Sequence, residues 1–210
     1  MKTEILPDLA SNWSTCNDIY KMIDECKRIG LKFAKLQLFK KNQVRDVYWN
    51  NILTKRMAEK AFIYGKSIGI EVYFTPCYPE AVDICKNIGV NYYKIRFKDR
   101  NNPDIFEKMQ DIYKPIFVSC QNPKDTLYYG MKNIIFLYCV HKYPAKPEEY
   151  NLSKAIRLCR GVSDHTSDMG FFGFCGSCFQ YWEMHMALRK GTLEEKWSKT
   201  FKEVEKYYKL

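Results

Sequence analysis

Long hydrophobic runs are absent from this sequence of 210 residues. The most apolar stretch, residues 134–140, has the length of a strand, whereas a membrane-spanning helix needs roughly 18 or more apolar residues in a row. Residues 1–6 also lack the apolar segment of a signal peptide. We therefore expect a protein without a membrane segment that stays in the cytoplasm.

Disulfide and zinc signatures are also lacking. The nine cysteines are odd in number and spread along the chain, mostly in apolar surroundings, which is typical of buried free thiols in a reducing compartment. The C-x-x-C pair, Cys175 and Cys178, has no second pair with which to hold a structural zinc ion. The glycines and phenylalanines around it favour a packed helix over a redox motif.

Charge of one sign is in moderate excess, with 34 basic and 24 acidic residues giving a net charge of +10. The lysines are scattered along the chain, and the tail from residue 199 mixes both signs as a solvated helix would. We expect no nucleic-acid partner and attribute part of the positive charge to the attraction of anionic small molecules.

Short β-rich runs alternate with amphipathic segments, which is the pattern of βα units around a parallel sheet. Ile19, Met22 and Cys26 show the spacing of one apolar helix face, and Gly69 and Gly89 stand where helices of this kind end. Eight strands are expected, at residues 4–7, 33–38, 71–75, 92–95, 115–119, 134–140, 161–163 and 181–185. No G-x-G-x-x-G or Walker A motif follows them, which disfavours an open doubly wound sheet. We predict an α/β fold, a compact (β/α)8 TIM barrel forming a single domain over residues 1–210.

In such a barrel the active site lies at the carboxyl ends of the strands. Lys35 and Lys94 stand inside apolar runs, where an unpaired ammonium is costly to bury. With the hydroxyls of Thr75, Ser119 and Ser163 they would form a pocket for a phosphate or a carboxylate. The alternative is that each ammonium reaches solvent at the barrel rim.

His165 and His185 end consecutive predicted strands. Because neighbouring strands lie about 5 Å apart, both imidazoles could reach one metal ion. Two histidines with water or substrate oxygens suit a labile octahedral ion of the Mn²⁺ type better than a closed tetrahedral zinc site. A pair of hydrogen-bonded core histidines without metal stays open as the alternative.

Two motifs form a specific pair: Gly-Val-Ser-Asp-His-Thr at residues 161–166 and Trp-Glu-Met-His-Met at residues 182–186. Further matching segments are residues 11–14, 34–39, 73–76, 93–95, 114–119 and 137–152. Together they closely resemble the sialic acid synthase (N-acetylneuraminate synthase) family. The resemblance implies a barrel enzyme that condenses phosphoenolpyruvate with an amino-sugar aldose such as N-acetylmannosamine and releases phosphate.

The resemblance also implies residue roles. His165 and His185 would bind a divalent metal, Mn²⁺ in first place, with Mg²⁺ or Co²⁺ as alternatives. Phosphoenolpyruvate would be held by Lys35, Thr75, Lys94, Ser119 and Ser163. The catalytic candidates are Asp8, Gln37, Tyr143 and His185, and the further substrate-binding candidates are Asp99, His141 and Glu194.

Several positions depart from the family pattern. Asp8 stands for a glutamate, His141 for an asparagine and Met184 for a lysine. Arg96 and Phe97 replace a Gly-Ser pair, so one hydroxyl on the phosphate side is lost. These departures leave two alternatives to a sialic or nonulosonic acid synthase: a synthase for a different aldose, or a non-catalytic barrel that binds a sugar or a phosphate.

Typical family members continue into an antifreeze-like domain that supplies a substrate-binding arginine to the partner subunit. We expect this domain to be absent here, which makes a homodimer only a weak expectation. Arg45 or Arg100 would then contact the N-acetyl side of the sugar instead.

Overall fold

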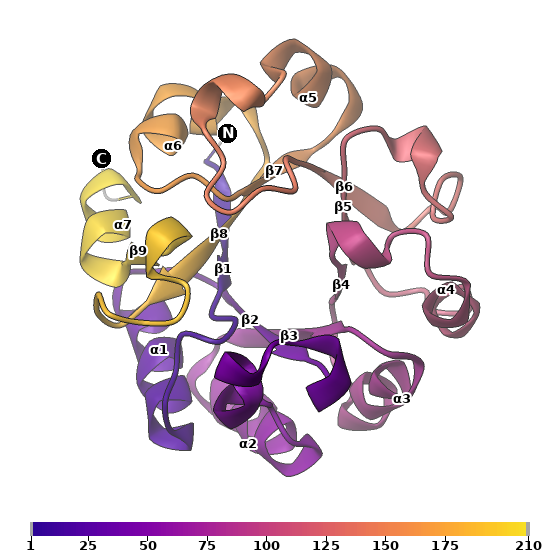
Figure 1. The fold of residues 1–210 in the computed structure, drawn as a ribbon, viewed down its shortest axis with the longest axis vertical. Coiled ribbons are helices and arrows are strands. Elements are labelled where there is room, and N and C mark those ends of the chain that lie inside the picture. Colours follow the sequence, from indigo (N-terminus) through magenta and orange to yellow (C-terminus); the bar gives the residue numbers. More distant parts are fainter. Residues whose placement is uncertain (1, 209–210) are drawn as a thin grey trace.

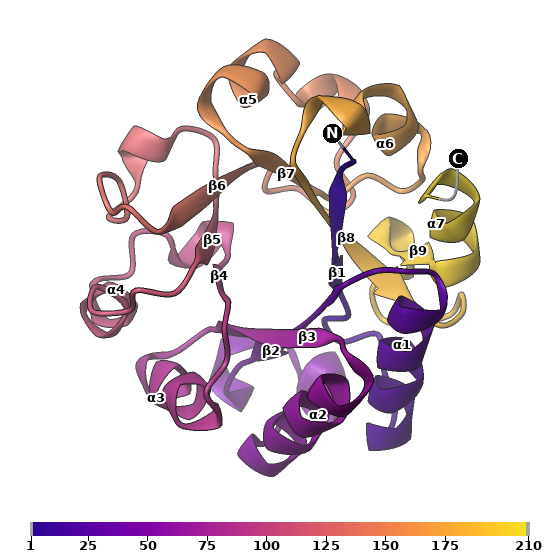
Figure 2. The same ribbon diagram turned by 180° about the vertical axis from the view of Figure 1, so that it is seen from behind.

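Parallel strands follow one another in chain order in the computed structural model, which describes residues 2–208. The first eight close into a barrel because β1 pairs with β8 (Figures 1 and 2). Their bounds are β1 (Glu4–Asp8), β2 (Phe33–Leu38), β3 (Glu71–Pro76), β4 (Tyr93–Ile95), β5 (Ile116–Cys120), β6 (Ile134–Cys139), β7 (Gly161–Asp164) and β8 (Tyr181–Ala187). The predicted TIM barrel is confirmed, and each predicted strand is present.

Helices surround the barrel on its outside (Figure 1). They are α1 (Cys16–Arg28), α2 (Lys55–Ile68), α3 (Pro79–Ile88), α4 (Pro103–Met109), α5 (Leu152–Leu158), α6 (Gly170–Cys175) and α7 (Phe201–Tyr208). Between β5 and β6 the described chain forms only a 3₁₀ turn, Pro123–Asp125, in place of an α-helix. The compact size of the barrel is therefore reached partly by shortening this unit.

Local sequence sets the helix ends. Thr15 caps α1 by accepting a hydrogen bond from the backbone of Asp18, whose carboxylate accepts one from the backbone of Thr15 in return. Helices α2 and α3 end where predicted, at Gly69 and Gly89. Their φ angles of +82° and +81° lie in the left-handed region that glycine adopts readily.

The tail differs from its predicted form. Lys199 and Thr200 form a short strand, β9 (Lys199–Thr200), which pairs with β8 before α7 begins. Lys199 is 1% exposed, because its ammonium finds acceptors inside the protein, Asp164 and the carbonyl oxygen of Thr166. The prediction of a solvated helix was therefore wrong for residue 199.

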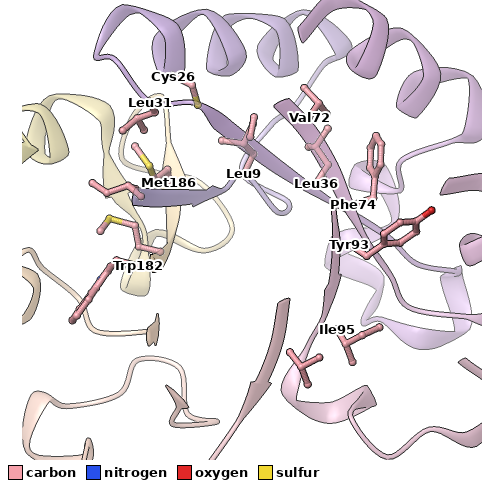
Figure 3. Packing of buried hydrophobic residues seen from close by; sticks show 14 of the residues in the cluster. Leu9, Cys26, Leu31, Leu36, Val72, Phe74, Tyr93, Ile95, Trp182 and Met186 are labelled. Atoms are coloured by element: carbon pink, nitrogen blue, oxygen red, sulfur yellow. The ribbon is translucent and has the colours of Figure 1, made fainter. Parts of the chain in front are cut away.

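Apolar side chains fill two regions. The larger lies between strands and helices, and Figure 3 shows Leu36, Val72 and Trp182 within it. The smaller fills the barrel interior towards the amino ends of the strands and consists of Leu6, Phe33, Tyr73, Phe117, Ile135 and Leu137. Since side chains alternate along a strand, Lys35, two residues after Phe33, continues the same inward face. The interior is therefore apolar at one end and polar at the other.

The cysteines are all free, and seven of the nine are buried, Cys16 and Cys178 being exposed. Cys175 ends α6, so the C-x-x-C pair lies on the expected helix and the turn that follows it. Within residues 2–208, no helix is long and apolar enough to cross a membrane.

Candidate active site

A cavity of about 390 Å³ lies at the carboxyl ends of the barrel strands. The predicted site residues that line it are Asp8, Lys35, Gln37, Lys94, Ser119, His141, Tyr143, Ser163, His165, His185 and Glu194. They come from along the whole sequence, and the pairing of β1 with β8 places Asp8 beside His185.

Two predicted residues, Thr75 and Asp99, are not part of this lining. Thr75 follows Tyr73 on the inward face of β3, and its buried hydroxyl has no hydrogen-bond partner among the described residues. Asp99 is ion-paired with Arg96, which does line the cavity. Asp99 therefore contacts a residue of the cavity lining without lining the cavity itself. Its predicted contact with substrate stays a prediction.

Lys35 is buried between two carboxylates. Its ammonium lies 2.6 Å from Asp8 Oδ2 and 2.5 Å from Glu183 Oε1, and all three side chains are 3% exposed. Burial acts to lower the pKa of Lys35, but the charges and hydrogen bonds of Asp8 and Glu183 raise it above its ordinary value. Burial acts to raise the pKa of Glu183, and the lysines hold it well below its ordinary range. Both groups are therefore charged.

Lys94 is equally buried but less fully paired. Its ammonium donates to Ser119 Oγ at 2.5 Å and lies 3.3 Å from Glu183 Oε2, to which Ser163 also donates, at 2.7 Å. Burial lowers the pKa of Lys94, and the charge of Glu183 offsets this only in part. Neither Lys94 nor Lys35 reaches solvent at the rim, and the structure brings both lysines together with the hydroxyls of Ser119 and Ser163 in one cavity.

His165 is anchored by its Nδ1 atom, which lies 2.8 Å from the carbonyl oxygen of Val140. Because a carbonyl oxygen only accepts, Nδ1 carries the proton and Nε2 keeps its lone pair. The Tyr150 hydroxyl fixes the backbone by accepting from the His165 N–H at 2.9 Å. Burial and the charge of His185 hold the pKa of His165 well below its ordinary value, so the ring is neutral.

His185 is anchored by a carboxylate. Its Nδ1 atom lies 2.7 Å from Glu194 Oε2, and its Nε2 atom lies 3.6 Å from Asp8 Oδ2. Burial acts to lower the pKa of His185, but Asp8 and Glu194 raise it above its ordinary value. The ring centroids of His185 and His165 are 5.5 Å apart. The two predicted metal ligands are therefore neighbours, and Glu194 contacts the ring of His185 directly.

The two imidazoles fit a metal site with two protein ligands. Metal-binding histidines usually give their second ring nitrogen to a carbonyl oxygen or a carboxylate, as Nδ1 does in both cases here. Residues 2–208 contain no group of three or more His, Cys, Asp or Glu side chains that could hold a metal ion. An ion held here would take its other ligands from water or substrate, unlike a closed zinc site.

Aromatic rings form one wall beside the histidines. The Tyr143 ring centroid is 4.1 Å from that of His165. The His141 ring is stacked on Phe97 at a centroid distance of 5.0 Å, and the guanidinium of Arg100 lies 3.9 Å from the Phe97 centroid. His141 is thus part of a stack rather than an isolated polar group.

Three further basic residues, Arg45, Arg96 and Lys98, line the cavity. Arg45 is exposed and comes from the loop after β2. Arg100 is not in the lining. Of the two arginines expected to contact the sugar, Arg45 therefore lines the cavity and Arg100 does not, and the contact itself stays a prediction.

The comparison with known sequences decides the family. The sequence model of the NeuB family matches residues 22–173. The chain belongs to the NeuB family. A Methanocaldococcus jannaschii protein, named Uncharacterized protein MJ1065, is 26% identical over 169 residues, which are 70% of this chain and 50% of that protein. This NeuB-family chain thus spans about half the length of the curated relative that it matches.

Solved structures share the fold of this NeuB-family chain. The N-acetylneuraminic acid (sialic acid) synthetase of Leptospira borgpetersenii has a TM-score of 0.86 at 19% identity, covering 100% of this chain and 82% of that one. Spore coat polysaccharide biosynthesis protein spsE of Bacillus subtilis has a TM-score of 0.81 at 17% identity, covering 99% of this chain and 66% of that one. A truncated 3-deoxy-D-arabino-heptulosonate 7-phosphate synthase of Thermotoga maritima has a TM-score of 0.75 at 11% identity, covering 99% of this chain and 84% of that one.

Sequence reasoning did not select several residues that line the site. Glu183, which holds both lysines, is the most important of them. The available signal was its position as an acid in an apolar strand, which requires a buried cation nearby. The others are Tyr48, Lys98, Cys139 and Trp197.

Proposed function

We propose that this NeuB-family chain condenses phosphoenolpyruvate with an N-acetylated aldose resembling N-acetylmannosamine, forming a sialic or related nonulosonic acid and releasing phosphate. One observation carries the proposal. A single cavity combines two buried lysines and their neighbouring hydroxyls with two imidazoles, each anchored through Nδ1. The lysines suit an anionic substrate, and the imidazoles suit a metal next to a carbonyl group.

Phosphoenolpyruvate would bind among the lysines. Its phosphate and carboxylate need cations in a site shielded from water, and the ammonium of Lys94 is the less compensated of the two. Lys35 and Ser163 donate hydrogen bonds to the carboxylate of Glu183, and Lys94 donates one to the hydroxyl of Ser119. These groups are therefore oriented before the substrate arrives. The unpartnered hydroxyl of Thr75 is the remaining candidate.

His165 and His185 would hold the metal, for which we propose Mn²⁺, with Mg²⁺ or Co²⁺ as alternatives. When bound, a divalent ion polarises the aldehyde oxygen of the sugar as a Lewis acid. Asp8 Oδ2 lies between Lys35 and His185 and accepts from Gln37 Nε2 at 3.2 Å. In this proposal Asp8 would contact the sugar or move protons, and Gln37 would orient it.

An aldose other than N-acetylmannosamine is the second candidate acceptor. The Phe97 ring contacts both His141 and Arg100, and it stands where the resembled family has a serine. This stack reshapes the wall beside Tyr143, which would contact the sugar. A cavity wall that differs from the family pattern favours a different acceptor sugar. The lysines and histidines of the family pattern are kept.

The test is phosphate release by the purified protein with Mn²⁺, phosphoenolpyruvate and N-acetylmannosamine, with the product identified by mass spectrometry. We expect release that requires both metal and sugar and is lost in H165A and K94M. Phosphate release with another aldose but not with N-acetylmannosamine would support a synthase with a changed acceptor. No release with any of several aldoses at millimolar concentration would refute the synthase and favour a barrel that only binds a sugar or a phosphate.

A further inference from the structure

A buried lysine contacts the chain on both sides of His165. Lys199 Nζ lies 3.3 Å from Asp164 Oδ2 and donates to the carbonyl oxygen of Thr166 at 2.7 Å. Asp164 Oδ1 accepts from the backbone N–H of Thr166, also at 2.7 Å. Residues 164–166 therefore form one tight turn that is closed by the ammonium, and His165 is its central residue.

The backbone of the same lysine is joined to the strand of His185. Lys199 begins β9 and pairs with Met186, the residue that follows His185. The segment between β8 and β9 carries Glu194, which binds Nδ1 of His185. Lys199 thus connects three parts of the chain: the turn of His165, the strand of His185 and the segment of Glu194.

Both members of this ion pair are fully inside the protein. Asp164 and Lys199 are 0% and 1% exposed, and Trp182 Nε1 donates to the same Asp164 oxygen at 3.1 Å. A buried ion pair generally contributes no more stability than apolar residues of similar volume, because both charges lose their hydration. The pair is therefore weak evidence for a stabilising role, and what distinguishes this ammonium is its fixed contact with two partners, Asp164 and Thr166.

We propose that Lys199 is a positioning residue that sets the relative placement of the two imidazoles. The proposal rests on the proposed function in that it assigns a metal to His165 and His185. Without the ammonium, the turn at residues 164–166 and the segment before β9 lose their common attachment. The rings, whose centroids are 5.5 Å apart, then lose a constraint on their separation.

The test compares K199M with M109A in the full chain. Met109 is fully buried in α4, across the barrel from β9 (Figure 1), so its truncation destabilises the protein without touching the turn. Calorimetry measures the Mn²⁺ affinity, and the Co²⁺ absorption spectrum reports the ligand geometry. We expect K199M to weaken Mn²⁺ binding by about 10- to 100-fold and to change the Co²⁺ spectrum. M109A should leave both unchanged.

Wild-type Mn²⁺ affinity and an unchanged Co²⁺ spectrum in K199M would overturn the proposal. If K199M does not fold, the variant D164N/K199M carries the same comparison with the same outcomes, because it buries no unpaired charge.

Failure of the proposed metal site would be recognised separately, as a wild-type protein that binds neither Mn²⁺ nor Co²⁺. The role of Lys199 is then judged from amide hydrogen exchange in the metal-free protein. Faster exchange in K199M than in M109A at both residues 163–167 and residues 185–198 supports the positioning role. Unchanged exchange in either segment overturns it.

Discussion

At the scale of single residues, Lys35 and Lys94 are both buried beneath the cavity but differ in their partners. Lys35 neutralises Asp8 and Glu183, whereas Lys94 shares Glu183 and donates to Ser119. Removing Lys35 would take from Asp8 its shorter ion pair, at 2.6 Å, and leave the longer contact with His185, at 3.6 Å. Removing Lys94 takes away a charge that burial already disfavours. Stability should therefore depend on Lys35, and anion binding on Lys94.

We predict that K35M lowers the free energy of unfolding by about 3–5 kcal/mol, whereas K94M changes it by less than about 1 kcal/mol. K94M should nevertheless remove most of the phosphoenolpyruvate affinity. Urea unfolding measures the change in stability, and titration of the folded variants with phosphoenolpyruvate measures the change in affinity. K108M is the control, because Lys108 forms an exposed ion pair with Asp83. Equal losses of stability in K35M and K94M would contradict this assignment.

At the scale of elements, α1 depends on the cap at its first turn. The Asp18 carboxylate accepts from the backbone N–H groups of Ser14 and Thr15, both at 2.9 Å, and these bonds hold the pKa of Asp18 below its ordinary value of 3.8. A carboxyl group whose pKa is lowered by folding stabilises the protein above its unfolded pKa. That stabilisation is lost as the pH falls through the folded pKa.

D18N removes the charge but keeps an acceptor oxygen, so it should lower the free energy of unfolding by about 0.3–1 kcal/mol at neutral pH. The difference from the wild type should shrink as the pH falls below 3.8. Urea unfolding at a series of pH values measures this dependence. K21A, at an exposed position of the same helix, is the control with little expected effect. A loss that is independent of pH would show that the charge of Asp18 does not contribute.

The long elements could be predicted because their signals are local. The apolar spacing in α1 and the glycines after α2 and α3 each report on a few adjacent residues. Strand β9 gave no such signal, because two residues have no period. It is held instead by pairing with β8 and by the contact of Lys199 with Asp164, 35 positions away.

At the scale of the whole molecule, closure of the barrel places Asp8 of β1 beside His185 of β8. A metal held by His165 and His185 would join β7 and β8 and would bind only the folded chain. It should therefore stabilise the entire protein by mass action.

The cytoplasmic location, the weak homodimer and the absence of an antifreeze-like domain stay predictions.

We expect Mn²⁺ at about 100 times its dissociation constant to add about 2.7 kcal/mol of stability. For a chain of this length, each added kcal/mol should raise the melting temperature by about 2–4 °C. Calorimetry with Mn²⁺, and again after chelation, measures the shift. H165A should show none of it, so a full shift in H165A would place the ion elsewhere.

The sequence by itself determined the barrel and most of the cavity lining. Strand periodicity fixes which residues share a face, and a barrel collects the polar ends of its strands on one side. Only the tertiary structure decided which groups pair. It placed Glu183 between the two lysines, buried Lys199 beside His165 and left Thr75 and Asp99 outside the lining. Such pairings depend on side chains meeting across strands that are distant in sequence, which no local pattern specifies.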